Sequence, residues 1–508
     1  MNDDDVAGLL DSATPLVSVE APAGCGKTFQ GAGYARRVAS GLERGQVLIL
    51  THTHAACGVF AKETRENARK VEIKTIDSLV VQIAAAYHKS LDLPADPAVW
   101  ARQNPPDGFA VIASRVSELL ASNPMIGNAL VERYPVLIGD EHQDSSADQH
   151  NIMMTFLASG ARLRIFGDPM QRIYGAKTQT AIDADRSRWE ALKQAGAFAE
   201  LENPHRWEEG SPELGQWILE ARHALKEGRP VDLTGRRPLG LNVLFAENTA
   251  QSAKDFRLSA EDRAPLDARV NADGQILVLT GQNDTARALR AFWNRKIAIW
   301  EGHTRDALGT LVNTVTAAGE PVAISRAVVE FLGSVGTGFS PSTHGDRLIQ
   351  EVTQGCTKKT RDKPAHIQAL GRFLLDEPNH IGVGKCLKHL AHLGNDKVPG
   401  FNEIRVDHRS EYRDAVRLAN FADAEEGLAE INRRRSLARP MPPPRAISTI
   451  HKAKGLECQN ALIVPCDQQR FSATDYSRCK LYVALSRAKR SLTLVLSRSN
   501  PSQLFHTG

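Results

Sequence analysis

The sequence predicts an α/β fold in which two parallel sheets are wrapped by helices and carry mainly helical insertions. Three observations support this class. Short apolar runs recur and end in Gly, Asp or Thr, longer helical patterns separate them, and the runs form two groups on either side of a long middle segment. The chain has 508 residues, more than one hydrophobic core usually fills, so we expect several domains.

Each expected strand is a short run of Val, Ile and Leu followed by turn residues, as in buried parallel sheets. The first group comprises Leu16 to Val19, Val47 to Leu50, Val136 to Ile138 and Leu163 to Phe166, and the second comprises Ile276 to Leu279, Ile447 to Ile450, Ala461 to Val464 and Leu492 to Val495. Between about residues 305 and 440 the pattern becomes helical, which predicts an inserted domain. Basic clusters at 358–363 and 433–435 lie within it, and the proline-rich residues 439–445 are expected to form a stiff connector.

Composition limits the class of protein. Hydrophobic residues make up 42% and charged residues 24%, which excludes a disordered chain, and the net charge of +4 is too small to identify a partner. The seven cysteines form no C-x-x-C pair and no cluster with metal-ligand spacing, so we expect a reducing compartment and no structural metal. The acidic start lacks signal-peptide features and no apolar stretch could cross a bilayer, so we expect a cytoplasmic protein without a membrane partner.

A glycine-rich loop follows the first expected strand. Residues 21–28 read Ala-Pro-Ala-Gly-Cys-Gly-Lys-Thr and a helical pattern follows, which is the order of a Walker A motif with Ala at the first Gly position. Gly24 and Gly26 allow backbone N–H groups to point at phosphate oxygens. Lys27 can reach the terminal phosphates and Thr28 can ligate Mg²⁺.

An apolar strand that ends in paired carboxylates supplies the second half of a nucleotide site. Residues 136–144 read Val-Leu-Ile-Gly-Asp-Glu-His-Gln-Asp. Asp140 would hold Mg²⁺, usually through water, and Glu141 would orient and deprotonate the attacking water. Two acids at a buried strand end are costly without a cation. The two motifs together predict hydrolysis of a nucleoside triphosphate.

The succession of further motifs resembles the UvrD/Rep group of superfamily 1 helicases. The matching blocks, in the family's order, are Asp-Glu-His-Gln-Asp at 140–144 (D-E-x-Q-D), Gly-Asp-Pro-Met-Gln-Arg-Ile-Tyr at 167–174 (G-D-x-x-Q-x-I-Y), Leu-Glu-Asn-Pro-His-Arg at 201–206 (L-x-x-N-Y-R), Thr-Ile-His-Lys-Ala-Lys-Gly-Leu-Glu at 449–457 (T-x-H-x-x-K-G-L-E) and Tyr-Val-Ala-Leu-Ser-Arg-Ala at 482–488 (Y-V-A-x-T-R-A). The resemblance implies two RecA-like motor lobes of the P-loop NTPase class. It also implies ATP and Mg²⁺ as cofactors and DNA as the partner.

The same resemblance assigns roles to single residues. Gln171 and Arg206 contact the terminal phosphate, Glu457 contacts the ribose, and Arg487 is the finger that the second lobe supplies. An arginine from a separate lobe helps hydrolysis only when the lobes close, so closure would depend on the nucleotide. The expected catalytic residues are Lys27, Glu141, Gln171, Arg206 and Arg487; the nucleotide-binding residues are Ala23, Gly24, Cys25, Gly26, Lys27, Thr28, His205, Gly455 and Glu457; and the metal ligands are Thr28 and Asp140.

Strand binding is expected at the ends of neighbouring strands. Residues 51–56 are similar to the family's T-x-x-A-A motif, and residues 75–79 to its T-x-H/D-x-F/L block. Hydroxyls and backbone amides bind phosphates without reading sequence, while aromatic faces accept any base. The expected DNA-binding residues are Thr51, His52, Thr75, Tyr174 and His451, with Trp207 as a further aromatic candidate for which core packing is an equal alternative.

The family resemblance also sets the expected domain limits. The first RecA-like lobe comprises 1–82 and 132–205 around a small helical insertion at 83–131, and the second comprises 206–305 and 440–508 around a helical accessory domain at 306–439. Two departures from the family leave the base selectivity open. Residues 1–15 contain no Gln that could read adenine, and His205 replaces the Tyr that stacks on it.

The compact build and short insertions resemble the helicase-like subunit of the Gabija anti-phage system, which partners a nuclease of the OLD family with ATPase and Toprim parts. Three hypotheses follow. The first is a motor that translocates along single strands with three-prime to five-prime polarity and unwinds duplex DNA. The second is a DNA-responsive regulatory ATPase that licenses such a nuclease and unwinds little. The third is a nucleotide switch that binds no nucleic acid.

Overall fold

The structure is a computed structural model that describes residues 1–104, 107–175, 178–251, 255–272, 274–300, 306–438 and 442–508. The chain divides into two compact units, residues 1–288 with 449–508, and residues 289–448. The expected α/β class is confirmed, because the chain forms two six-stranded sheets and many helices. Residues 439–441 of the expected connector and the side chains of the basic cluster at 433–435 lie outside the described residues.

The first sheet has the strand order β3-β2-β4-β5-β1-β6, and its paired strands are parallel. Its strands are β1 (Leu16–Glu20), β2 (Val47–Thr51), β3 (Val71–Thr75), β4 (Val136–Gly139), β5 (Arg162–Gly167) and β6 (Ala197–Glu200). All four strands expected in this part of the chain are therefore confirmed. Strands β1, β4 and β5 are neighbours, so the loops that follow their carboxyl ends meet at one edge of the sheet.

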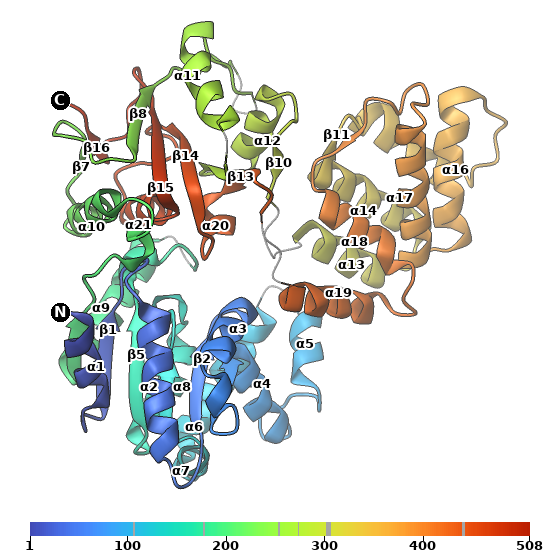
Figure 1. Cartoon of the computed structure of the whole chain (residues 1–508). Coiled ribbons are helices and arrows are strands. Elements are labelled where there is room, and N and C mark those ends of the chain that lie inside the picture. The colour runs from blue at the N-terminus through green and yellow to red at the C-terminus, as the bar shows by residue number, and fades with distance from the viewer. Residues whose placement is uncertain (105–106, 176–177, 252–254, 273, 301–305, 439–441) are drawn as a thin grey trace. The chain divides into compact units, whose positions relative to one another are not determined.

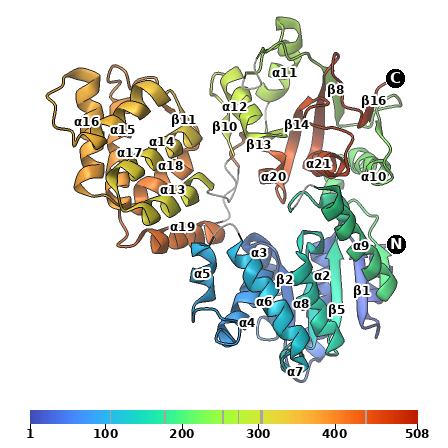
Figure 2. The ribbon, with the colours of Figure 1, turned by 180° about the vertical axis from the view of Figure 1, so that it is seen from behind.

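Helices cover both faces of this sheet, as its uninterrupted apolar strands require. Side chains alternate along β2, so Val47 and Ile49 join one core while Leu48 and Leu50 join the other. Helices α1 (Asp3–Asp11) and α2 (Lys27–Gly41) pack in the first core, and α4 (Ile76–Ala86), α6 (Gly108–Ser122) and α8 (Ala147–Ala158) pack in the second. In Figure 1 helix α2 lies in front of the sheet, and in the reverse view of Figure 2 helices α6 and α8 do.

Shorter elements complete this first lobe, which extends beyond the expected limit at residue 205 because Leu219 joins the core of the first sheet. They are α3 (His54–Glu63), η1 (Arg65–Asn67), α5 (Pro97–Gln103), α7 (Pro124–Arg133), η2 (His142–Asp144), η3 (Pro169–Gln171), α9 (Gln179–Ala195), η4 (His205–Trp207) and α10 (Pro212–Lys226). Residues 83–131 contain α5, α6 and α7, and α6 contributes Ile112, Val116 and Leu120 to the sheet core. The insertion therefore packs directly on the lobe that carries it.

The second sheet has the order β10-β13-β9-β14-β15-β8. Its strands are β8 (Leu241–Phe245), β9 (Ile276–Thr280), β10 (Ala298–Ile299), β13 (Arg445–Thr449), β14 (Cys458–Cys466) and β15 (Ala488–Leu496), with helices α11 (Ala260–Asn271), α12 (Asn283–Phe292), α20 (Ile450–Ala453) and α21 (Asp475–Leu485) and the small strands β7 (Val231–Asp232) and β16 (Phe505–His506). The strand expected at Ile447 to Ile450 ends one residue earlier, because Thr449 caps α20 and its side chain accepts from the N–H of Lys452. We call the part of this sheet in the first unit, with α20 and α21, the second lobe.

The unit of residues 289–448 is helical, as the sequence predicts. Apart from the end of α12, β10 and most of β13, its elements are α13 (Asp306–Ala318), α14 (Pro321–Val335), η5 (Pro341–Asp346), α15 (Arg347–Thr353), α16 (Asp362–Asp376), α17 (His380–Asn395), α18 (Arg409–Leu418) and α19 (Ala424–Ala438), with the two-residue strands β11 (Gly336–Thr337) and β12 (Arg405–Val406). Ile324, Leu387 and Phe401 are among the residues of its apolar core. Over the described residues of the whole chain, no helix has both the length and the apolar character that crossing a bilayer requires.

Candidate nucleotide site

The loop between β1 and α2 has the backbone of a phosphate cradle. Gly24 and Gly26 have φ values of 78° and 81°, which residues other than glycine rarely adopt. Gly26 is the N-cap of α2 and supplies no side-chain cap, so the first N–H groups of the helix remain available. Free N–H groups and the positive end of a helix dipole together bind anions, so the loop suits the phosphates of a nucleotide. The two glycines that the sequence singles out therefore both adopt the left-handed conformation.

Three charged side chains meet beside the loop. Lys27 Nζ lies 3.1 Å from Asp140 Oδ1 and forms an ion pair with Glu141 Oε1. Burial opposes the charge of Lys27, but the two carboxylates raise the pKa of Lys27 above its usual value. Burial likewise opposes ionisation of Glu141, yet the charges of Lys27 and Lys454 lower the pKa of Glu141. Both groups are therefore charged at neutral pH.

Glu141 also has a strained backbone. Its φ is 54°, a left-handed conformation that costs a non-glycine residue about 1–3 kcal/mol. Strain of this kind persists where the surroundings hold it in place, and it occurs often at active sites. The turn directs the Glu141 carboxylate toward Lys27, so the residue expected to activate water is held next to the residue expected to bind phosphate.

The residues present fit a magnesium ion. Asp140 Oδ1 is buried with Lys27 Nζ at 3.1 Å, and burial raises the pKa of Asp140 despite the opposing charge of Lys27. A carboxylate in this state gains from a nearby cation. Thr28, one residue after Lys27 at the start of α2, would add a hydroxyl ligand. Among the described residues, no group of three or more His, Cys, Asp or Glu could hold a metal.

A hydrogen-bond chain leads from Glu141 to Gln171. The side-chain amide of Gln143 donates to Glu141 Oε2, and its oxygen accepts from the backbone N–H of Asp168 at 3.0 Å. Gln171 Nε2 in turn donates to Asp168 Oδ2 at 3.0 Å. Gln171 is buried, so packing and this hydrogen bond hold its side chain in place. A change in the position of Gln171 would therefore reach the Glu141 carboxylate through Asp168 and Gln143.

Arg206 joins the loop to the second lobe. Its backbone N–H donates to Gly24 O at 3.1 Å, and a Cβ built on Gly24 would lie 2.6 Å from Arg206 Cβ. Its guanidinium donates to Ser486 O at 2.7 Å and pairs with Glu457 at 2.8 Å. Glu457 also pairs with Lys489 at 2.6 Å. The structure thus brings the predicted residues Arg206 and Glu457 together at the mouth of the cradle.

Arg487 is buried beside Arg206 but is bonded to its own lobe. It donates to Val483 O at 2.8 Å, to Leu456 O at 3.1 Å and to Ser486 Oγ at 2.6 Å. Burial, followed by the like charge of Arg206, lowers the pKa of Arg487 to about 10. An arginine held by carbonyls in a low-dielectric site keeps its charge available for an anion that approaches it.

Other predicted nucleotide residues surround the loop. His205 Nε2 hydrogen-bonds with Asp3 at 2.8 Å, and its ring lies 3.3 Å from the Cβ position of Gly26. Burial opposes the charged imidazole, but the bonds to Asp3 and Glu208 raise the pKa of His205. Gly455 has a φ of 82° with open space at its Cβ position. Ala23 and Cys25 are buried parts of the loop backbone.

Two residues to which the motifs assigned no role hold the site together. Tyr482 accepts a hydrogen bond from the N–H of Ala23 at 2.8 Å, so an aromatic side chain of the second lobe bonds the phosphate loop of the first. Arg222, on α10, is 0% exposed and lies 5.9 Å from the centre of the Tyr482 ring. It donates to Asp168 at 3.0 Å, to Glu200 at 2.6 Å and to Glu20. Its partners are far apart in sequence, so no local pattern reveals it.

Replacing Tyr482 with Phe should weaken the joined arrangement of the lobes. The change leaves the buried N–H of Ala23 without its acceptor, which costs about 1–3 kcal/mol. We expect a lower free energy of unfolding in urea by that amount for the nucleotide-free protein. Tyr87→Phe, at an exposed tyrosine, is the matched control and should leave stability unchanged. Equal stability of wild type and Tyr482→Phe would contradict the importance of this bond.

The residues predicted to bind a DNA strand differ from one another in exposure. Tyr174 is 47% exposed, donates to His451 O at 3.1 Å, and has Lys454 Nζ at 4.8 Å from its ring centre. Thr51 and Thr75 are buried, the first donating to Thr53 O and the second capping α4. The hydroxyls of these two threonines are therefore not exposed in this arrangement.

His52 and His451 are only partly buried. His52 hydrogen-bonds with Ser145 Oγ at 3.1 Å, and His451 with Tyr476 Oη at 2.5 Å. Trp207 is wrong as an aromatic candidate for bases. It is 0% exposed, donates to Ala488 O at 2.6 Å and packs against Gly24, because it fills the space between the loop and the second lobe.

Comparison with known proteins agrees with the sequence motifs. Residues 100–181 match the UvrD/REP helicase N-terminal domain, and residues 445–495 match the UvrD-like helicase C-terminal domain. No curated protein matches the chain. The crystal structure of the Pif1 helicase from Candida albicans is similar, with a TM-score of 0.39 and 11% identity over 98% of this chain and 95% of that one. The two matched segments are thus similar to parts of UvrD-like helicases.

Proposed function

We propose that the chain is an ATP-dependent DNA helicase of the UvrD/Rep type, which hydrolyses ATP to move along single-stranded DNA from three-prime to five-prime and to unwind duplex. One observation carries the proposal. The buried cluster of Lys27, Asp140 and Glu141 lies in the first lobe, and Arg206 links the adjoining loop to Glu457 of the second. A site built from two lobes can couple hydrolysis to their relative movement.

The chain's own residues would divide the chemistry among them. The loop N–H groups and Lys27 bind the phosphates, and Glu141 takes the proton of the attacking water. A magnesium ion held by Thr28 and Asp140 would neutralise charge on the phosphate oxygens. Arg206 and Arg487 stabilise the charge that develops on the transferred group. Triphosphate binding would release Lys27 from Glu141, so the carboxylate becomes free to act as a base as the site fills.

A second set of contacts connects the phosphate site to the candidate strand-binding surface. Lys454, in the second lobe, donates to Asp144 at 2.5 Å and to Gln171 O at 2.8 Å, and its charge lies over the ring of Tyr174. A movement of Gln171 toward a phosphate would change these contacts. Tyr174 would then shift against any base stacked on it, which supports the conversion of nucleotide state into movement along a strand.

ATP turnover with and without single-stranded DNA tests the proposal. We expect DNA to raise the rate roughly 5- to 150-fold, the usual range of coupling between two sites. Lys27→Ala should abolish both rates, since the phosphates lose their buried cation. A rate that is indifferent to DNA would support a simple nucleotide switch and contradict the motor.

Strand displacement on a three-prime-tailed and a five-prime-tailed duplex then tests polarity and separates the motor from the regulatory alternative. We expect displacement only from the three-prime tail. Brisk turnover on DNA without displacement from either tail would favour a DNA-responsive regulatory subunit of a Gabija-like complex. In that case addition of an OLD-family nuclease should produce DNA cleavage that depends on ATP.

A further inference from the structure

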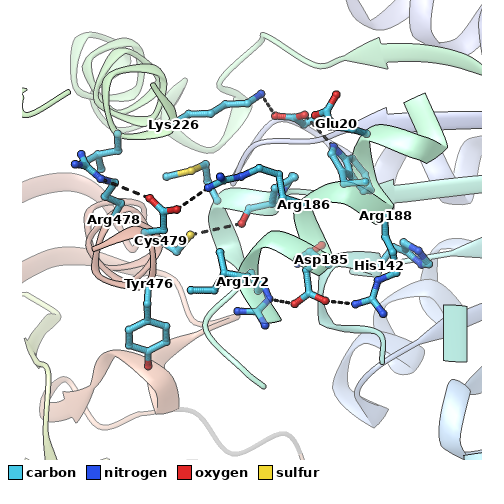
Figure 3. Close-up of a pocket in the computed structure, with 18 of the residues that line it drawn as sticks. Glu20, His142, Arg172, Asp185, Arg186, Arg188, Lys226, Tyr476, Arg478 and Cys479 are labelled. Carbon is cyan, nitrogen blue, oxygen red and sulfur yellow. Dashed lines mark hydrogen bonds and ion pairs between the residues drawn. The ribbon is translucent and has the colours of Figure 1, made fainter. Parts of the chain in front are cut away.

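The residues that line a cavity of about 280 Å³ include Glu20 and Gln143 and none of the phosphate loop. Its walls come from η2, η3, α9 and α10 of the first lobe and from α21 of the second. Figure 3 shows the side chains of these elements pointing toward one another across the space. None of the roles assigned to the nucleotide or the DNA strand uses this cavity.

The inner surface of the cavity suits a flat apolar group. Met170, Ile182, Trp189 and Leu225 line it, and Cys479 closes it from the second lobe by donating to Pro169 O at 3.6 Å. The volume is just below the range of about 300–1,000 Å³ that is usual for sites of drug-sized ligands. A compound with one or two fused rings would therefore fill it.

The charged groups of the cavity favour an anion. Asp185 is shared by two arginines, Arg172 and Arg188, so one carboxylate faces two guanidinium groups (Figure 3). Arg186 and Arg478 both approach Asp475, at 2.7 and 3.9 Å. Guanidinium groups that share a carboxylate retain donors for a second anion.

The other carboxylates at the cavity do not cancel its preference for an anion. Arg186 has a second carboxylate, Asp183, at 3.6 Å, but that pair is more than half exposed on both sides. The two other acids of the lining already have cations: Glu20 bonds Lys226 and the buried Arg222, and Glu190 bonds Lys193 at 3.0 Å. The side of the cavity formed by Asp185 and its arginines therefore offers the donors.

We propose that this cavity is a binding site for a small planar anion, an aromatic ring that carries one acidic group, and that its occupant holds the two lobes together. The ring would lie among Met170, Ile182 and Trp189, and the acidic group would take donors from Arg188, which uses Nη2 for Asp185. Because α9 and α21 belong to different lobes, a ligand that touches both favours the arrangement in which they are close. The site is separate from the nucleotide site but adjoins it through Gln143, which lines the cavity and donates to Glu141.

Direct binding tests the site without reference to ATP turnover. Naphthalene-2-sulfonate is the probe, with 2-naphthol and 2-naphthyltrimethylammonium as neutral and cationic compounds of the same ring. In calorimetric titrations of the full chain we expect the sulfonate to bind with a Kd of about 0.1–1 mM, as its size allows. The neutral compound should bind more weakly and the cation not measurably. A cation that binds as tightly as the sulfonate, or a sulfonate that does not bind at millimolar concentration, would overturn the proposal.

Three variants place the probe in the cavity. Ile182→Trp, from α9, and Cys479→Phe, from α21, fill the space from opposite lobes and should weaken sulfonate binding at least about tenfold. Thermal unfolding shows whether each cavity-filling variant folds. If one of them does not fold, sulfonate binding to the other tests the site. Arg188→Gln should reduce sulfonate affinity while leaving that of 2-naphthol unchanged. Full affinity in a folded cavity-filling variant would show that the probe binds elsewhere.

The effect of a bound ligand on the lobes can be measured in the kinetics of ATP hydrolysis. A ligand that bridges the lobes should lower kcat for ATP several-fold without raising KM, because it slows reopening and does not occupy the nucleotide site. The cavity-filling variants should be insensitive to the sulfonate. Simple competition with ATP would contradict a separate site even if binding were observed.

Discussion

Arg487→Ala should lower the maximal rate of ATP hydrolysis by roughly 10³- to 10⁵-fold, the usual effect of removing an arginine finger. The expectation rests on burial and position. Arg487 lies beside Arg206, whose backbone bonds the phosphate loop, and its pKa remains near 10 despite burial, so it is charged at neutral pH. Single-turnover hydrolysis with saturating ATP and DNA measures the chemical step, and a fluorescent ATP analogue measures binding, which should persist.

Arg490→Ala is the matched control for that result. Arg490 is an exposed arginine on β15, three residues from Arg487, and its removal should leave the rate within about twofold. Arg487 makes three hydrogen bonds within its lobe, so its removal could also destabilise the fold. Thermal unfolding of the variant should therefore be measured together with the kinetics. A folded Arg487→Ala protein with a near-normal rate would leave Arg206 as the residue that stabilises the transition state.

Glu141→Gln should lower the same rate by about 10²- to 10⁴-fold while nucleotide binding is kept. An amide has nearly the shape of the carboxylate but cannot accept the proton of water. The low pKa of Glu141, which Lys27 maintains against burial, means that the base is ionised well into the acidic range. In the nucleotide-free wild type, where Lys27 still pairs with Glu141, the carboxylate should therefore stay ionised between about pH 7 and pH 5.

Lys27→Ala distinguishes binding from chemistry in the same experiments. It should lose tight ATP binding, whereas Glu141→Gln should bind ATP at least as well as the wild type, because one competitor for Lys27 is neutralised. Slow turnover in Glu141→Gln should also allow the bound state to accumulate on DNA. If both variants lost binding equally, Glu141 would be a structural partner of Lys27 and not the base.

Much of the fold is readable from the sequence because its signals are local. The eight expected strands are buried runs of Val, Ile and Leu, and the phosphate loop follows from two glycines, a lysine and a threonine in fixed order. Strand β3 is less clear, since its centre reads Glu-Ile-Lys and is only partly buried. Strand β8 is partly exposed along most of its length, so its pattern resembles that of a loop.

The parts of the site that local pattern could not supply depend on residues brought together by the fold. Arg222 gathers acids from the ends of β1, β5 and β6, and only the sheet order makes these neighbours. Trp207 follows a motif arginine and so suggested a base-stacking role, but its burial depends on Gly24 and Ala488, which lie far from it in sequence. The threonines Thr51 and Thr75 likewise end strands as expected, yet both hydroxyls are used internally.

The hydrogen bond between Tyr482 and Ala23 favours one arrangement of the two lobes in the nucleotide-free protein. A neutral hydrogen bond contributes about 1 kcal/mol, or roughly a fivefold preference, toward the state in which it forms. The nucleotide-free protein is thus biased toward the arrangement in which Tyr482 contacts the loop at Ala23. If hydrolysis separates the lobes as we propose, the residue at position 482 would set how readily they part while making no contact with the reacting groups.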